Sequence, residues 1–203
     1  MLVNGTQDHV EGLWGDTETV LSGVGLRLAP EKTRIVHIDE GFDFLGFRIQ
    51  RCRQRGSNRQ LIYTFPSRRS MASIKRKVKA ATRQVTHQDA DRLFRQLGSM
   101  TRGWAQYFRH GSSSKAYQHL QHYLWWRVWE WLCNKHPRTS KRWIIHRYYN
   151  GWWPEYNDVS LWKPATMTIQ RYRYRGTRIP TPWDKQTNHN THLTAARGEP
   201  GAR

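Results

Sequence analysis

Cysteine is scarce in this sequence, and long apolar runs are absent. The 203 residues include two cysteines, Cys52 and Cys133, and neither has a CxxC or His-Cys partner set nearby. This arrangement argues against structural zinc and is typical of two reduced thiols in a cytoplasmic protein. No apolar run approaches the roughly 20 residues of a transmembrane helix, and no secretory signal opens the chain, so we expect no membrane partner.

Acidic residues are also scarce, since 15 of them face 34 lysines and arginines, which gives a formal net charge of +19. The imbalance is local: residues 1–45 carry a net charge of −5, whereas residues 46–203 carry +24. Ten of the eleven tryptophans lie between Trp104 and Trp183. A basic, aromatic-rich segment of this kind indicates a polyanion partner, and nucleic acid fits better than a membrane surface.

The first third of the chain reads as a mixed α+β segment. Apolar residues at three- and four-residue spacing predict a helix over residues 6–24, which Gly23 and Gly25 end. A β-branched run predicts a strand over residues 33–38, followed by a turn at 39–41. Two further strands are expected in "FDFLGFRIQ" and "LIYTF", joined by the polar turn "RCRQRGSNRQ", and Pro66 closes the segment.

Helical periodicity dominates the middle of the chain. It predicts helices over residues 67–86, from about Asp89 to Gly111, over 115–135 and over 139–149. After Gly151 the helical period is lost, and alternation predicts a short strand within residues 166–176. Residues 186–203 are poor in bulky apolar side chains and are expected to be disordered.

The helix expected at residues 67–86 has a one-sided charge. Its apolar stripe contains Met71, Ile74, Val78, Ala81 and Val85. An advance of about 100° per residue places six basic residues opposite that stripe: Arg68, Arg69, Lys75, Arg76, Lys79 and Arg83. Exposed helices usually interleave both signs of charge, so we favour a phosphate-binding face over a merely solvated one.

Two more segments mix aromatics with basic residues. In "SMTRGWAQYFRHG" we expect Met100 and Trp104 to pack in the core, and we predict nucleic-acid contacts from Arg102, Arg109 and His110. In "RYRYRG", alternation separates an arginine row (Arg171, Arg173, Arg175) from Tyr172 and Tyr174. The tyrosines would either stack on unpaired bases or be buried.

Three segments together resemble the group II intron reverse transcriptase/maturase family of mobile elements. "GLRLAPEKTRIVHIDEGFDFLGFRI" resembles the end of the polymerase palm, "SMTRGWAQYFRHG" the core of the maturase domain, and "IQRYRYRGTRIPTPW" the basic segment that closes this domain. The resemblance covers about residues 1–183. It implies an α+β fold with a palm remnant at 1–66, a thumb and maturase domain at 67–185 and a tail at 186–203.

The resemblance also suggests a role for the hairpin at "FLGF". Phe44, Leu45, Gly46 and Phe47 resemble the primer grip of polymerases, where Gly46 would let the backbone approach a nucleic-acid strand. The alternative is that the three apolar side chains simply belong to the core. Lys32 resembles a lysine that follows the catalytic strands in these polymerases, and we expect it to be idle here.

The family's catalytic Tyr-Ala-Asp-Asp motif does not occur in this sequence, and neither does a Cys/His-rich endonuclease domain. We therefore expect no catalytic residue and no bound cofactor, with Mg²⁺ confined to a separate palm or to the RNA. The resemblance implies a protein that binds group II intron RNA and stabilises it for splicing. The alternatives are the C-terminal half of a split RNA-directed DNA polymerase, active only with a separate palm polypeptide, and a decayed remnant without a role. A DNA target is a further partner that the resemblance leaves open.

Overall fold

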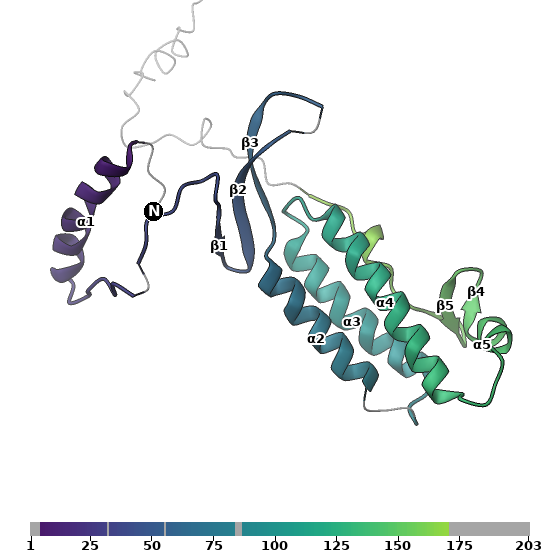
Figure 1. The fold of residues 1–203 in the computed structure, drawn as a ribbon. Coiled ribbons are helices and arrows are strands. Elements are labelled where there is room, and N and C mark those ends of the chain that lie inside the picture. The colour runs from purple at the N-terminus through teal and green to yellow at the C-terminus, as the bar shows by residue number, and fades with distance from the viewer. Residues whose placement is uncertain (1–4, 32, 55, 84–86, 171–203) are drawn as a thin grey trace, which may run out of the picture. The chain divides into compact units, whose positions relative to one another are not determined.

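The computed structural model describes residues 5–31, 33–54, 56–83 and 87–170. These residues form helices and two small antiparallel sheets, which confirms the expected α+β class (Figure 1). The first sheet, of strands β1, β2 and β3, precedes the main helices in the chain, and the second, of β4, β5 and β6, follows them. The division of the chain at residues 66 and 185 stays a prediction.

The first helix, α1, spans Gln7–Ser22, close to the expected range. Thr6 caps it, because its side-chain oxygen accepts a hydrogen bond from the backbone nitrogen of His9. Gly23 stands at its C-terminal cap position. None of its described residues is buried, and Val20 is 73% exposed.

The prediction of a strand at residues 33–38 is wrong, because this segment, which the structure describes from Thr33 onward, forms no strand or helix. A hydrogen bond from the backbone nitrogen of Arg51 to the carbonyl of Ile38 attaches the end of the segment to the sheet. β-Branched residues favour a strand only where a neighbouring strand pairs with them along a ladder. The expected turn follows at residues 38–40.

The first sheet consists of β1 (Phe42–Phe44), β2 (Phe47–Arg53) and β3 (Gln60–Pro66) in the order β1-β2-β3. The continuous strand expected in "FDFLGFRIQ" is interrupted, because the chain reverses at Leu45 and Gly46. Both residues have positive φ, 47° and 81°, as a two-residue hairpin turn requires. β2 also runs further than expected, so the polar turn is shortened to residues 54–59.

Three helices build the main core: α2 (Arg68–Arg83), α3 (Ala90–Phe108) and α4 (Ser114–Lys135). All three were expected, and Figure 1 shows them packed side by side. From α2, Ile74 and Val78 of the expected stripe are buried, and Met71 and Ala81 pack against the same core. The α3 and α4 side chains that complete it include Leu93, Phe94, Leu97, Leu120, Leu124, Val128 and Leu132.

The last described part contains α5 (Lys141–Tyr148), as expected, and a small sheet that the sequence did not predict. This sheet consists of β4 (Tyr149–Asn150), β5 (Trp153–Tyr156) and β6 (Val159–Ser160). A 3₁₀ turn, Pro164–Thr166, follows. The strand expected within 166–176 is not formed up to residue 170, and the remainder lies outside the described residues.

Candidate nucleic-acid interface

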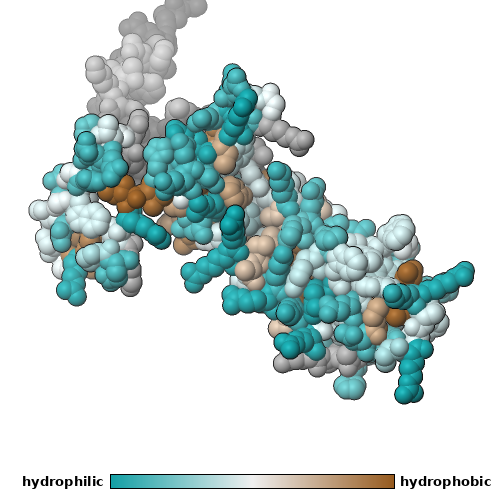
Figure 2. Space-filling model, viewed as in Figure 1, coloured by the Kyte–Doolittle hydropathy of each residue, from teal (hydrophilic) through white to brown (hydrophobic). Residues whose placement is uncertain are grey.

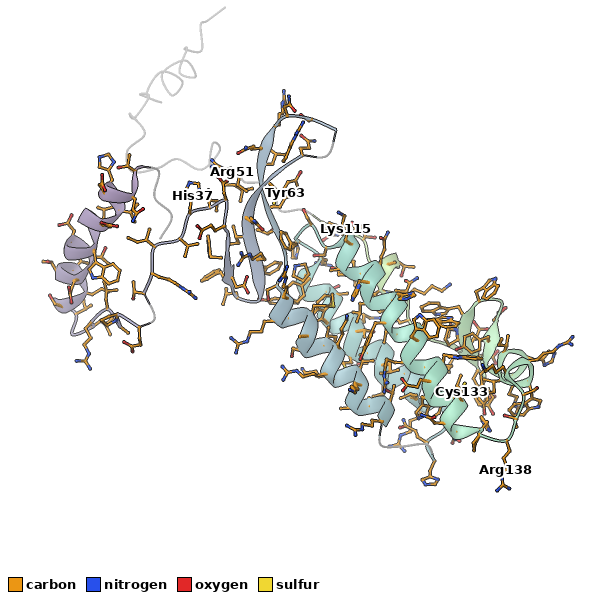
Figure 3. The ribbon with its side chains drawn as sticks, in the orientation of Figure 1. His37, Arg51, Tyr63, Lys115, Cys133 and Arg138 are labelled. Atoms are coloured by element: carbon orange, nitrogen blue, oxygen red, sulfur yellow. The ribbon has the colours of Figure 1, made fainter. Side chains whose placement is uncertain are left out.

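The basic face of α2 concentrates positive charge on a helix that has no acidic residue. Its sixteen residues contain seven lysines and arginines and no acidic residue. Within the part of the chain that the structure describes, none of the seven forms an ion pair. Long side chains with nitrogen tips project from the outer edge of α2 (Figure 3), and this edge is hydrophilic (Figure 2).

Five of the six basic residues predicted on α2 are exposed: Arg68, Arg69, Arg76, Lys79 and Arg83. Sequence reasoning missed a further one, Lys77, which is also exposed. Lys77 lies on the flank where α2 faces α3, across an open groove that Arg92 and Gln96 also line. The absence of any acidic neighbour was a sequence signal that applied to Lys77 as well.

Lys75 differs from the other predicted residues because it is half-buried where α2 meets α4. Its Nζ atom contacts Nε2 of His119 and lies 5.0 Å from the ring centre of Tyr123. The Tyr123 hydroxyl donates to the Lys75 carbonyl at 3.3 Å. Burial, and then the charges of Lys75 and His122, lower the pKa of His119, so its imidazole is neutral near pH 7 and accepts from the ammonium.

The inner face of α2 is held at both ends, which leaves the outer face free. At the start, the Ser67 hydroxyl accepts from the Ser70 nitrogen at 3.2 Å, and Ser70 Oγ donates to the carbonyl of Gly46 at 2.8 Å. Near the end, Arg127 of α4 donates from Nε and Nη2 to Thr82 Oγ1, at 3.1 and 2.7 Å. These contacts hold α2 in place, and none of them involves the exposed lysines and arginines of its outer face.

The three RNA-contact candidates in and after α3 lie in two different places. Arg102 is exposed, with its guanidinium 5.7 Å from the ring centre of Trp162. Arg109 and His110 lie together beside Gln170, whose nitrogen donates to the Arg109 carbonyl at 2.9 Å and whose carbonyl lies 3.0 Å from His110 Nδ1. Arg171, Tyr172, Arg173, Tyr174 and Arg175 lie outside the described residues, so their joining this surface stays a prediction.

The aromatics of "GWAQYF" pack rather than point to solvent, with one exception. Trp104 is half-buried and its ring lies 4.7 Å from that of Phe108, and Met100 packs against the main core, as expected. Tyr107 is the exception, because its side chain is exposed. Its hydroxyl donates to the carbonyl of Leu45 at 2.7 Å, so this side chain links α3 to the hairpin turn.

The "FLGF" hairpin is divided between packing and exposure. Phe47 packs on Phe108, with ring centres 4.8 Å apart, but Phe44 and Leu45 are 57% and 69% exposed, so a core role is wrong for these two. A Cβ on Gly46 would stand 2.8 Å from Ser70 Oγ, so the turn tolerates no side chain there. A primer-grip role for the hairpin remains a prediction.

The described residues contain no group of three or more histidine, cysteine, aspartate or glutamate side chains close enough to hold a metal ion. Among the same residues, no helix has the length and apolar character needed to cross a membrane.

Comparison with known proteins supports the resemblance seen in the sequence. Residues 71–149, which run from the first turn of α2 to the start of β4, match the family described as "Group II intron, maturase-specific domain". A 71-residue stretch is 37% identical to Protein YkfC of Escherichia coli (strain K12). This match covers 34% of the chain and 19% of that relative, so the chain spans about a fifth of the relative's length. The expected resemblance is confirmed for the segment that carries most of the basic face.

Proposed function

We propose that this chain binds folded group II intron RNA through the basic face of α2 and thereby stabilises the splicing-active form of that RNA. The observation that carries this proposal is the set of exposed, unpaired cations on a helix most of which lies in the maturase-specific segment. Each cation that meets a phosphate releases condensed counterions, which makes binding favourable and dependent on salt.

The chemistry of splicing would stay with the RNA in this proposal. A ligand shifts a conformational equilibrium by as much as its affinity for the two states differs. A protein that fits the phosphates of the folded RNA better than those of unfolded forms therefore raises the folded population. No nucleophile or general base of the protein is needed for that effect.

The salt dependence of binding tests the role of α2. Replacing Arg76, Lys79 and Arg83 with Gln removes three exposed charges but keeps long, helix-forming side chains. With an in vitro transcribed group II intron RNA, the slope of log affinity against log salt should become shallower by about 2–3 units. The fold, followed by circular dichroism, should be unchanged.

A matched control removes three arginines elsewhere. Arg48 and Arg51 are paired with Asp43 and Asp39, and Arg53 donates to the carbonyl of Ser57. Their joint replacement with Gln should change the slope much less, because these side chains already have partners. Equal slopes for both triple variants would mean that net charge alone governs binding, and the α2 proposal would fail.

The second candidate function is that of one half of a split reverse transcriptase. It is favoured by apolar side chains exposed along the first 66 residues, among them Val20, Leu26, Leu45 and Ile62. Packing of this segment against another protein element would cover these side chains. Mixing the chain with a separate palm polypeptide that carries the Tyr-Ala-Asp-Asp motif tests this idea. Template-dependent primer extension by the mixture, and by neither part alone, would support it.

A further inference from the structure

An exposed ridge on α4 combines basic residues with a tryptophan. Lys115, His119, His122 and Trp126 follow one another at spacings of four, three and four residues, so they lie on one face of the helix. All four are exposed, and no acidic residue occurs in α4 before Glu130, which is paired with Arg127. Lys115 is labelled near the start of this helix in Figure 3.

This ridge runs beside the basic face of α2. Lys75 contacts His119 and Tyr123, and Thr82 accepts from Arg127, so residues further along α2 meet residues further along α4. The two helices therefore run parallel. Lys79 and Arg83 follow Lys75 at four-residue intervals on the same flank of α2. Lys79 accordingly comes alongside the α4 turn between Tyr123 and Trp126.

Trp126 is half exposed yet held in place. Its side chain is 51% exposed. Its indole Nε1 donates to Nε2 of His122 at 2.9 Å, and its ring meets that of Trp125 edge to face at 5.1 Å. Trp125 is fixed in turn, because its own Nε1 donates to the carbonyl of Trp152 at 2.9 Å. A ring ordered before binding loses little conformational entropy when a ligand stacks on it.

We propose that Trp126 is a stacking platform for an unpaired base of the bound RNA, with Lys79 and Arg83 of α2 holding the adjoining phosphates. This inference rests on the proposed function and names the kind of RNA that the surface takes: a single-stranded segment, since paired bases do not offer their faces. The positive surroundings favour a nucleotide over an apolar protein partner, because a nucleotide supplies both the flat apolar ring and the anion.

Two RNA probes of equal charge separate stacking from phosphate binding. One is an oligouridylate, and the other is an abasic ribose-phosphate oligomer of the same length. Replacing Trp126 with Leu keeps an apolar side chain but removes the aromatic plane. The Trp126→Leu variant should lose roughly five- to 150-fold in affinity for the oligouridylate and almost nothing for the abasic oligomer. Trp126→Phe should retain much of the preference for bases.

The control is Trp143 of α5, which is similarly exposed but lies off the ridge. Trp143→Leu should leave both affinities unchanged. An unchanged ratio between the two affinities in Trp126→Leu would overturn the stacking proposal, both when neither affinity changes and when both fall equally. The equal fall would indicate a structural effect of the substitution. The Arg76, Lys79 and Arg83 triple variant should weaken both probes, and if it weakens neither, the proposed function itself fails.

Discussion

The ammonium group of Lys75 on α2 lies against Nε2 of His119 on α4, with the ring of Tyr123 beneath it. The two helices are thus joined at this point by a cation and a neutral imidazole, with no carboxylate between them. The contact removes Lys75 from the outer face of α2 and shifts the centre of that face to Arg76, Lys79 and Arg83. It also brings His119 of α4 next to the basic helix.

Lys75 and Lys79 should therefore differ when each is replaced with Gln. Lys79→Gln should make the salt slope of RNA binding shallower by about 1 and leave thermal stability unchanged. Lys75→Gln should change the slope less and lower the melting temperature, because it breaks contacts between α2 and α4. Filter binding over a salt series and thermal denaturation measure both effects. Identical behaviour of the two variants would show that Lys75 is as available to phosphate as Lys79.

Acid should destabilise the protein through two histidines. The pKa of His119 is lowered by burial and by Lys75 and His122, and the pKa of His136, which packs against Tyr148 and Trp143, is lowered by burial and by Lys135. A histidine with a lower pKa in the folded state binds protons more readily when unfolded. The free energy of unfolding should therefore decrease as the pH falls below the ordinary value of 6.5 and through the folded-state pKa.

Urea denaturation at about pH 7.5 and about pH 5.5 checks this dependence across the histidine range. In a variant with His119→Gln and His136→Gln, the loss of stability between the two conditions should be smaller. A wild-type protein equally stable at both values would rule out this assignment.

Two glycines of "GWAQYFRHG" should respond to alanine in opposite directions. A Cβ on Gly111 would stand 2.8 Å from the Thr64 carbonyl and 3.2 Å from Phe47, so Gly111→Ala should cost about 1–3 kcal/mol of stability. A Cβ on Gly103, within α3, would meet nothing within 4 Å, so Gly103→Ala should stabilise by about 0.5–1 kcal/mol. Chemical denaturation gives both values. A neutral Gly111→Ala would mean that the β3 segment yields easily at this contact.

Hydrogen exchange should distinguish the segment before the first sheet from the helical core. Residues 33–41 have no ladder, whereas Leu97, Leu124 and Val128 are fully buried in helices. The amides of residues 33–37 should exchange orders of magnitude faster than those at the centres of α3 and α4. Arg51 is a useful internal reference, because its amide bonds to the carbonyl of Ile38. Equal protection of residues 33–37 and the α3 core would indicate a partner for this segment.

Local chemistry was enough to predict the helices. The repeat of Met71, Ile74 and Val78 determines both the helical period of α2 and its buried face. Thr6 marks the start of α1, because its side chain accepts a hydrogen bond from a backbone nitrogen of the first turn. The glycines after α1 mark its end. The basic outer face of α2 follows from the same period, which is why most of its exposed cations could be predicted.

Elements that depend on a distant partner could not be predicted in the same way. Residues 33–38 have strand propensity but no neighbouring strand, and β5 contains Pro154, which argues against a strand in the sequence. β5 nevertheless forms, because Tyr149 and Val159 bring partner strands to both of its sides.

The sequence and the tertiary structure each decided part of the candidate site. The sequence by itself determined that α2 is basic on one side and that α4 is rich in tryptophan. Only the tertiary structure decided that α2 and α4 run parallel, so that Lys75 contacts His119 while Lys79 comes alongside the α4 turn between Tyr123 and Trp126. The reason is physical: a helical period determines which residues share a face, but the direction and offset of a second helix depend on packing between residues some 45 positions apart, such as Thr82 and Arg127.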